Sequence, residues 1–349
     1  MRKLAYKEAL AEALVQAMEK DKNVFVMGEG VDDLIGIFGT TLTAHKKFPK
    51  RVIDMPLSEA LITGAGTGAA LAGMRPVMVH ARNDFLYLAM DQIANHAAIW
   101  SYMHGGGIKI PWVIRAIIGR GWGNGPQHSQ SLQALFAHIP NLKVVMPTTP
   151  YRAKGLLIAA IEDNSPVMFI EHRSLYHIEE SVPKKYYSLP LDKGSVVKKG
   201  KDLTFVAVSF MVVEAVKAAA ILKKKGIDAE IIDVSSIKPL DKKLICGSVK
   251  KTGRAIILDT AWKSFGVSAE ISAIINESIF SNLKSPVRRI ALPDLPIPCS
   301  PALENVYYPG IKEIVNETMR LFGRKLLTKK EFEAEERSRG EKFQFQGPF

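Results

Sequence analysis

One acidic side chain, Glu59, stands in a stretch of the sequence made almost entirely of small and apolar residues. The stretch covers residues 51–79 and reads RVIDMPLSEALITGAGTGAALAGMRPVMV. Burying an uncompensated carboxylate is costly, so such a group is normally paired or used in chemistry. Glu59 could cap the helix expected at 59–72, after Ser58 as N-cap residue, or it could transfer protons with a pKa that burial raises. Taken alone, the stretch favours the capping role, and the remainder of the chain reverses that preference.

A second candidate for acid/base chemistry, His128, follows a glycine-rich loop at 119–125. The glycines alternate with other residues and do not form the dinucleotide-binding fingerprint, because no GxGxxG opens a helix directly after a strand. Such a loop is permissive backbone beside a ligand or a moving segment. A lone histidine is usually structural, but one between a glycine loop and a short helix, expected at 129–138, is a better candidate for proton transfer.

The elements that must position these residues alternate between short apolar strands and helices. Strands are expected at 24–27, 52–55, 76–79, 111–115, 143–146 and 167–170, and helices at 6–20, 59–72, 84–103 and 151–161. This alternation predicts an α/β fold, a parallel sheet with helices on both faces.

The second half of the chain repeats the alternation on a smaller scale. Strands are expected at 203–208, 229–234, 255–258 and 287–291, and helices at 212–225, 242–252, 268–279 and 310–321. We therefore expect a first domain at 1–180, a polar linker at 181–200 and a smaller α/β domain at 201–323. A charged tail at 324–349 is expected to be surface-bound or mobile.

Composition limits the classes of function. The formal net charge is +12, but the basic residues are scattered, and no stripe of them interleaves with aromatic residues as in nucleic-acid-binding proteins. A solvated basic surface that attracts anionic substrates or an acidic partner fits better. Two cysteines, Cys246 and Cys299, suit a reducing compartment, and no signal peptide or membrane-spanning run is present. We expect a soluble, cytoplasmic protein that binds neither nucleic acid nor membrane.

Several long blocks of the chain resemble the beta subunit of thiamine-diphosphate-dependent 2-oxo acid dehydrogenases. These are the decarboxylase components of the pyruvate and branched-chain complexes. The blocks are, in order, YKEAL, PLSEALITGAGTGAALAGMRPVM, AMDQIANHAA, GPQHSQSLQALFAHIPNLKVVMPTTPYRAKGLL, DNSPVMFIEH and IIDVSSIKPLD. The resemblance implies a pyrimidine-binding thiamine-diphosphate fold for the first domain and a transketolase C-terminal-like fold for the second.

The resemblance also implies roles for individual residues. Glu59 matches the glutamate that hydrogen-bonds N1′ of the aminopyrimidine and favours the imino tautomer, whose nitrogen deprotonates C2 of the thiazolium. Phe85 matches the aromatic residue against which the aminopyrimidine packs, and Leu57 and Ala81 match positions beside the cofactor. His128 matches a histidine near C2 that binds the substrate carboxylate or assists transfer to the lipoyl group.

Two metal ions are implied by the same resemblance. Carbonyl groups around Ala160 and Ile161, together with Asp163, match a structural potassium site. The Mg²⁺ that binds the diphosphate is held in this superfamily by a GDG motif followed by an Asn, and no GDG occurs in the chain. We therefore expect an alpha subunit to carry the diphosphate and Mg²⁺ half of the site, in an α₂β₂ heterotetramer.

The chain departs from the family pattern at two places. His80 and Arg82 stand where the family usually has a different sequence, and they could recognise a polar or anionic substrate or simply rearrange the surroundings of the cofactor. The segment LDTAWKSFGVSAEI also differs, in the domain where the family docks a lipoyl acyltransferase core.

Three functions follow from these observations. The first is a 2-oxo acid dehydrogenase beta subunit, in which acyl transfer to lipoamide completes an oxidative decarboxylation. The second is a split transketolase-like or carboligating enzyme, which passes the fragment to an aldehyde or a sugar. A non-catalytic scaffold is the third, and the joint presence of Glu59, Phe85 and His128 argues against it.

Overall fold

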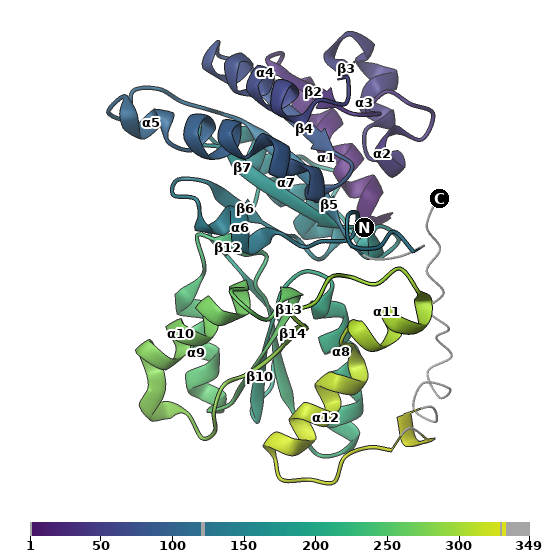
Figure 1. The fold of residues 1–349 in the computed structure, drawn as a ribbon, viewed down its shortest axis with the longest axis vertical. Coiled ribbons are helices and arrows are strands. Elements are labelled where there is room, and N and C mark those ends of the chain that lie inside the picture. The colour runs from purple at the N-terminus through teal and green to yellow at the C-terminus, as the bar shows by residue number, and fades with distance from the viewer. Residues whose placement is uncertain (1, 120–122, 329, 333–349) are drawn as a thin grey trace. The chain divides into compact units, whose positions relative to one another are not determined.

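The structure is a computed structural model, and it describes residues 2–119, 123–328 and 330–332 (Figure 1). The described residues form two compact units. The first consists of 2–119, 127–193 and 236–239, and the second consists of 123–126, 194–235 and the described residues from 240 onward. Within the described ranges, no helix combines the length and the apolar character needed to cross a lipid bilayer.

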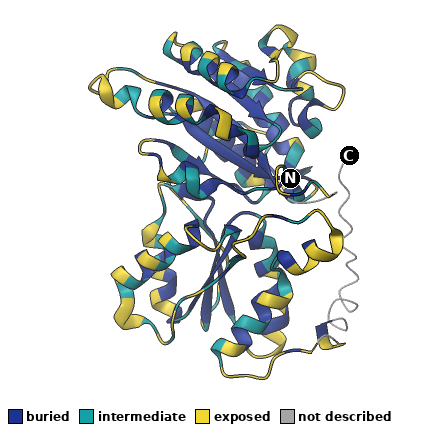
Figure 2. Ribbon diagram, in the orientation of Figure 1, coloured by how far each residue is buried: buried dark blue, intermediate teal, exposed yellow. Residues whose placement is uncertain are grey.

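The first unit is built on a sheet of seven strands. In spatial order they are β12 (Ser236–Lys238), β6 (Lys143–Val145), β7 (Val167–His172), β5 (Val113–Ile118), β4 (Arg75–His80), β2 (Val24–Gly28) and β3 (Val52–Asp54). All neighbouring pairs are parallel except β12 and β6. Every residue of β5 and β7 is buried (Figure 2), as expected for central strands covered on both faces. The predicted parallel sheet is confirmed.

Helices cover this sheet. They are α1 (Tyr6–Lys20), α2 (Gly36–Gly39), α3 (Leu42–Lys47), α4 (Glu59–Leu71), α5 (Trp100–Met103), α6 (Gln133–His138) and α7 (Pro150–Glu162), with the short 3₁₀ turns η1 (Pro49–Arg51) and η4 (Arg173–Leu175). Helix α1 packs against α7 and buries Leu10, Leu14 and Met18, the apolar stripe that its sequence predicts. A two-stranded antiparallel ribbon joins β1 (Lys3–Ala5) to β8 (Glu179–Ser181).

Two helices predicted in this unit differ in the structure. Residues 84–103 do not form one helix but a 3₁₀ helix η2 (Asn83–Ala89), a π-helix η3 (Gln92–Ala97) and the short α5. The helix predicted at 129–138 begins only at Gln133. Hydrogen bonds from the side chains of Asn83 and Asp84 to the backbone of Gln130 and Leu132 hold the starts of both segments away from regular helix.

The second unit has a sheet of five strands. In spatial order they are β14 (Arg288–Leu292), β13 (Ala255–Trp262), β10 (Leu203–Ala207), β11 (Ala229–Asp233) and β9 (Ser195–Lys198), and only β9 is antiparallel to its neighbour. The helices are α8 (Met211–Lys224), α9 (Lys242–Thr252), α10 (Val267–Ile279), α11 (Pro301–Tyr307) and α12 (Ile311–Leu321), with the 3₁₀ turn η5 (Phe280–Asn282). Strand β9 lies in the stretch predicted as linker, because an edge strand with little buried surface carries no long apolar run.

Two segments lie where the sequence did not predict them. Strand β12, from the block IIDVSSIKPLD, belongs to the sheet of the first unit, where Lys238 Nζ donates to the carbonyls of Ala137 (2.8 Å) and Ile139 (2.6 Å). Leu327 and Phe332, expected in a surface-bound or mobile tail, are buried in the core of the second unit. Residues 333–349 of that tail lie outside the described part of the chain.

Candidate active site

The candidate site lies at the carboxyl ends of the parallel strands of the first sheet, where open α/β sheets bind their ligands. The register aligns Gly28 of β2 with Asp54 of β3 and Val79 of β4, so the residues that follow leave the sheet at one edge. Gly28 is required here, because a Cβ at this position would lie 2.2 Å from the Val79 carbonyl oxygen. Glu29 and His80 are the first residues after this contact.

Glu59 is buried, as predicted, and is 9% exposed at the first position of α4. Ser58 occupies the N-cap position, but its side chain makes no capping hydrogen bond. Glu59 lies close enough to Glu29 for its charge to act on that residue. The structure therefore places the predicted carboxylate beside a second one.

Glu29 is a site residue that the sequence analysis missed. Burial, and then the charges of Glu59 and Asp54, raise the pKa of Glu29 to about 7. Its Oε1 is buried without a hydrogen-bond partner among the described residues. The signal that could have identified it is its place at the end of the buried strand β2, between two glycines.

His80 is 1% exposed, and both ring nitrogens lack a hydrogen-bond partner within the described chain. Burial lowers the pKa of His80 to about 4, so the ring is neutral at pH 7. Its Nδ1 lies 3.9 Å from Glu29 Oε1. This contact joins a neutral ring to a carboxyl group and is not an ion pair, and His80 offers an anion no positive charge.

Phe85 and His128 are brought together. Their ring centroids are 5.2 Å apart and the rings meet edge to face at 78°. The loop that carries His128 is tied to η2, since Asp84 Oδ1 accepts from the Gln130 amide at 3.0 Å and Asn83 Oδ1 accepts from the Leu132 amide at 3.0 Å. The two segments predicted to supply an aromatic wall and an acid/base group thus form one surface.

Two other predicted cofactor contacts are more open. Leu57, on the turn before α4, is 82% exposed, and Ala81, just after β4, is half-buried. Of the glycine-rich loop before His128, residues 120–122 lie outside the described part of the chain, and Trp122 is among them.

Groups predicted to bind potassium contact the positively charged side chains of Arg75 and Lys143. Arg75 Nη1 donates to the carbonyl oxygens of Ile161 (2.9 Å) and Asp163 (3.0 Å). The Asp163 carboxylate pairs with Lys143 Nζ and accepts from the Ser165 amide at 2.8 Å. A carbonyl oxygen has two lone pairs, so these contacts leave room for a further ligand on each oxygen.

The residues present fit the cofactor that the resemblance implies. Glu29 Oε1 and the His80 ring nitrogens are buried polar atoms to which no described residue gives a hydrogen bond. Such atoms are rare unless a ligand or water satisfies them. They lie at the strand ends beside Glu59, and the Phe85 ring supplies an aromatic surface in the same unit. A heteroaromatic ring with hydrogen-bonding nitrogens suits this combination of groups.

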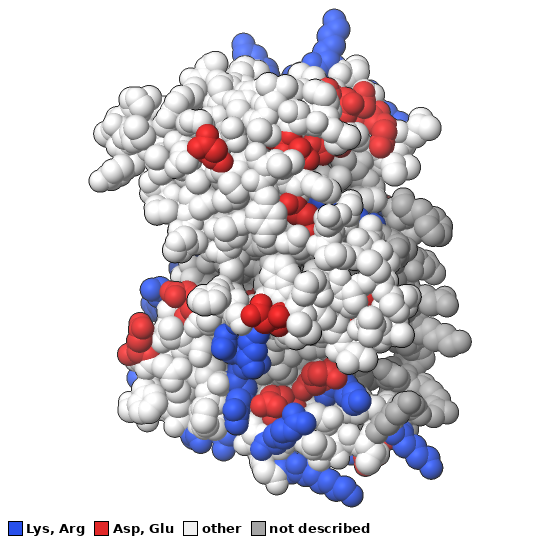
Figure 3. Space-filling view, in the orientation of Figure 1, with Lys and Arg blue, Asp and Glu red and all other residues white. Residues whose placement is uncertain are grey.

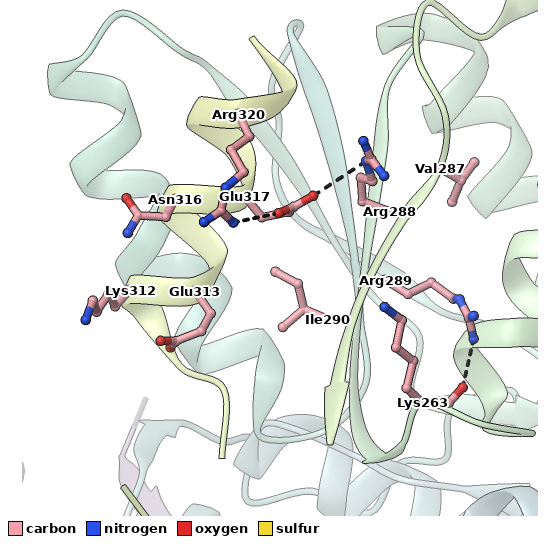
Figure 4. A pocket seen from close by; sticks show the side chains of 10 residues that line it. All are labelled: Lys263, Val287, Arg288, Arg289, Ile290, Lys312, Glu313, Asn316, Glu317 and Arg320. Atoms are coloured by element: carbon pink, nitrogen blue, oxygen red, sulfur yellow. Dashed lines mark hydrogen bonds and ion pairs between the residues drawn. The ribbon is translucent and has the colours of Figure 1, made fainter. Parts of the chain in front are cut away.

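A separate pocket of about 470 Å³ lies in the second unit, between β14 and α12 (Figure 4). On the face drawn in Figure 3, Lys and Arg side chains gather on this unit. Arg288 and Arg320 both pair with Glu317, and Arg289 donates to the Lys263 carbonyl. None of the predicted site residues lines this pocket.

Comparisons with known proteins agree with this geometry. Residues 2–179 match the family described as transketolase, pyrimidine binding domain, and residues 192–314 match transketolase, C-terminal domain. The beta subunit of acetoin:2,6-dichlorophenolindophenol oxidoreductase from Cupriavidus necator is 42% identical over 323 residues, which cover 90% of this chain and 96% of that protein. The pyruvate dehydrogenase E1 component subunit beta from Bacillus subtilis is 42% identical over 315 residues, with coverage of 90% and 96%. The chain belongs to this transketolase-like family of dehydrogenase beta subunits.

The fold of this family member also matches a solved structure. A split-gene transketolase, described as an inactive beta4 tetramer, superposes with a TM-score of 0.75 at 24% identity, covering 92% of this chain and 98% of that one. The expected resemblance and the expected fold of both domains are therefore confirmed.

Proposed function

We propose that this chain is the beta subunit of a heterotetrameric, thiamine-diphosphate-dependent 2-oxo acid dehydrogenase, which carries out oxidative decarboxylation with acyl transfer to lipoamide. One observation carries the proposal. It is the buried Glu59 carboxylate beside Glu29, whose raised pKa lets it hold a proton and whose Oε1 has no hydrogen-bond partner among the described residues, at the carboxyl ends of the strands. Relatives of about 42% identity are named as beta subunits of enzymes that act on pyruvate or acetoin.

Each residue has a task in this proposal. When bound, thiamine diphosphate supplies an acidic carbon that can add to the carbonyl group of a 2-oxo acid. Glu59 accepts a hydrogen bond from the aminopyrimidine and exchanges a proton with its ring nitrogen. Glu29, with a pKa of about 7, carries a proton in about half of the molecules at pH 7, so the pair does not hold two full negative charges. Phe85 packs on the aminopyrimidine, with Leu57 and Ala81 beside it, and His128 faces the substrate.

An alpha subunit, a structural ion and an acyltransferase core complete the proposed assembly. An alpha subunit supplies the diphosphate and Mg²⁺ site that a GDG motif would carry, and the enzyme is an α₂β₂ heterotetramer in the cytoplasm. Carbonyl groups of Ala160 and Ile161, with Asp163, bind a structural potassium ion on their remaining lone pairs. The second unit docks a lipoyl acyltransferase core.

A second candidate is a carboligating or split transketolase-like enzyme, in which an aldehyde or sugar takes the fragment. Two observations favour it. One relative is named for acetoin, a hydroxyketone rather than a 2-oxo acid. The other is the positive charge of Arg82 at the strand ends, which would suit an anionic sugar.

The deciding experiment is to co-purify the chain with its candidate alpha subunit and to titrate thiamine diphosphate and Mg²⁺ into each chain and into the pair. We expect tight cofactor binding by the pair only. The pair is then assayed for ¹⁴CO₂ release from labelled 2-oxo acids, for acetoin cleavage and for reduction of a dye acceptor. Tight binding by this chain alone would exclude a shared site. A pair that binds cofactor yet releases no CO₂ from any 2-oxo acid would favour the second candidate.

A further inference from the structure

The pocket between β14 and α12 in the second unit, which we call the β14–α12 groove, carries an excess of positive charge (Figure 4). Two carboxylates line it, against five cationic side chains, which are Lys263, Arg288, Arg289, Lys312 and Arg320. Glu214 of α8 approaches the start of α12, where its Oε2 would lie 3.2 Å from a Cβ added at Gly310, but it does not line the groove. The groove keeps a net positive charge even when this third carboxylate is counted.

Both carboxylates of the lining are engaged inside the second unit. Glu313 Oε2 accepts from the Gly310 amide at 2.9 Å and so caps the N-terminus of α12. Glu317 pairs with Arg288 at 3.5 Å and with Arg320 at 3.0 Å. One carboxylate thus serves a helix terminus, and the other is shared by two arginines.

The two lysines of the groove are unpaired. Neither Lys263 Nζ nor Lys312 Nζ forms an ion pair or a hydrogen bond with a described residue, and both side chains are exposed. Like charges gathered in one groove raise its electrostatic potential and attract anions. The groove therefore offers an anionic ligand two free cations in addition to its arginines.

The donors on α12 follow one line along the helix. Lys312, Asn316 and Arg320 all line the groove and are four residues apart, so successive positions are about 6 Å apart on one helix face. Asn316 Oδ1 accepts from the Leu327 amide at 3.1 Å, which leaves the two side-chain amide hydrogens to donate. The row spans about 12 Å. This length suits an extended ligand that carries several separate anionic groups.

Strand β14 forms the other side of the groove and is the edge of its sheet. It pairs in parallel with β13, and no other strand in the described ranges pairs with it. The consecutive residues 287–290 all line the groove, although side chains of a strand alternate between the two faces of a sheet. The groove therefore borders the edge of β14, where backbone N–H and C=O groups can pair with a further strand.

We propose that the β14–α12 groove binds an extended acidic segment of a partner protein, which adds to the edge of β14 as a further strand. Such addition takes its affinity from main-chain hydrogen bonds and its specificity from alternate side chains. Alternate residues of an extended chain lie about 6.6 Å apart on one side. This spacing matches the spacing of about 6 Å between Lys312, Asn316 and Arg320. Acidic residues at alternate positions therefore each meet one donor of α12.

A compact anion suits the groove less well. The cations are divided between two elements and lie along about 12 Å of helix, so a single phosphate reaches only some of them. Glu317 stands between Lys312 and Arg320 on α12 and repels a dense negative charge placed there. Spaced carboxylates of a peptide can lie on either side of it.

Positive charge on an edge strand also prevents pairing between copies of the same chain. That role accounts for Arg288 and Arg289, which belong to β14. It does not account for Lys312, which lies on the helix across the groove. The inference goes beyond the proposed function, because it uses only residues of the second unit and needs neither the cofactor nor an alpha subunit.

The first test measures the binding of a defined peptide to the purified full-length chain. The probe is a fluorescein-labelled octapeptide in which Glu and Thr alternate, followed by fluorescence anisotropy at about 0.15 M salt, where exposed charges act over about 8 Å. We expect the wild type to bind it, and to bind the same peptide with Gln in place of Glu roughly 10-fold more weakly or worse. Lys312→Glu and Lys263→Glu, which break no ion pair, should each lower the affinity for the acidic peptide roughly 10-fold or more.

The control variant is Lys243→Glu. Lys243 is exposed on α9 and does not line the groove, so the same charge change there should leave the affinity unchanged. Thermal melting of each variant checks that it is folded. Equal losses in Lys243→Glu and Lys312→Glu would mean that the peptide responds only to the net charge of the chain, and would overturn the site.

The second test examines the main chain of the peptide. Two further probes carry N-methyl groups on every Glu or on every Thr, which keeps all charges and removes one set of N–H donors. Only every second N–H of an added strand faces β14, so we expect one of the two probes to bind roughly 10-fold more weakly. Binding of both probes as tight as that of the parent peptide would contradict strand addition.

Inorganic tripolyphosphate serves as the compact competitor. We expect it to displace the peptide only at concentrations well above the Kd of the peptide. Tight tripolyphosphate binding that Lys312→Glu and Lys263→Glu abolish, together with weak peptide binding, would make the groove a site for small anions and would overturn the proposed partner.

Discussion

At the scale of single residues, the main feature of the site is a group of neighbouring carboxylates. Glu29, Asp54 and Glu59 lie at the carboxyl ends of the strands, and His80 beside them is neutral at pH 7. Carboxylates in such proximity cannot all ionise easily, so the group with the most raised pKa keeps its proton near neutral pH. Proton exchange with a bound ring nitrogen is the chemistry that such a cluster suits.

Replacing Glu59 by Gln tests its role as the proton-exchanging group. Gln keeps the shape and one hydrogen bond but cannot exchange a proton, so we expect kcat of the assembled enzyme to fall about 10²- to 10⁴-fold. Thiamine diphosphate should still bind, as measured by titration of the variant complex. Undiminished turnover would support a scaffold role for this chain.

Replacing Glu29 by Gln tests the carboxylate cluster through stability. The pKa of Glu29 is about 7 in the folded chain against an ordinary value of 4.5, so the folded state binds more protons between these values. The wild type therefore loses stability as pH rises from 4.5 to 7. Since Gln cannot ionise, the melting temperature of the variant relative to wild type should be higher at pH 8 than at pH 5.

The control for Glu29 is Glu277→Gln, which changes an exposed carboxylate on α10. Its effect on the melting temperature should be small and similar at both pH values. A difference between Glu29→Gln and wild type that stays constant with pH would contradict the raised pKa.

The sequence predicted some of these residues and not others. Glu59 was identifiable because a lone carboxylate in an apolar stretch is conspicuous in the sequence itself. Glu29 was not, because its proximity to Glu59 depends on the register and order of strands that are far apart in the chain. His80 was singled out, but its neutral charge state follows from burial that only the structure reveals.

At the scale of elements, helix α4 requires small residues only on the side that faces Trp112. A Cβ at Gly66 would lie 2.9 Å from Nε1 of the fully buried Trp112. A Cβ at Gly68, two residues further on, would meet no atom of the described residues within 4 Å. The same residue type therefore has a packing requirement at one position and none at the other.

These two glycines give a matched pair of variants. Gly66→Ala should destabilise the chain by about 1–3 kcal/mol, because Trp112 must move in a packed core. Gly68→Ala should leave stability unchanged or raise it by up to about 1 kcal/mol, the helix propensity gain of alanine. Chemical denaturation of the two variants measures the difference, and equal effects would contradict the contact.

A buried ion pair links β5 and β7. Arg115 and Glu171 are both 0% exposed, and the Tyr176 hydroxyl also donates to Glu171. Glu171→Gln should cost about 3–5 kcal/mol of unfolding free energy, because it leaves the arginine charge buried without a counter-ion. Glu19→Gln, in an exposed pair with Lys47, should cost less than about 1 kcal/mol. A double variant Arg115→Met/Glu171→Leu that is no more stable than Glu171→Gln would contradict this reasoning.

Helices and strands were predicted well where a local pattern, an apolar run or an amphipathic period, determines them. The buried strands and the amphipathic helices α1, α7 and α8 lie within a few residues of their expected bounds. The helices predicted at 84–103 and 129–138 were wrong at their first residues. There, hydrogen bonds between Asn83 or Asp84 and residues 46 to 49 positions away override local propensity. Such bonds leave no periodic signal in the sequence.

At the scale of the whole molecule, the chain does not divide at a single boundary. It builds most of the first unit, contributes residues 123–126 to the second, and passes into the second again at residue 194. It then returns to the first unit for residues 236–239, which include β12, and afterwards completes the second unit. The sequence indicated two domains, but the return of β12 was invisible because three residues carry too little pattern to assign a strand to a sheet.

A break in the backbone after residue 193 would therefore separate the first sheet from one of its own strands. The fragment 1–193 would expose the edge of β6, while the fragment 194–349 would carry the strand that covers it. Exposed edges associate with any available strand, so the first fragment alone should aggregate. Refolded together, the two pieces should recover a soluble, co-eluting pair, since the second fragment acts as a strand donor to the first. The covalent order of this protein thus makes it a candidate for split-protein reconstitution, in which reassembly needs no added tag.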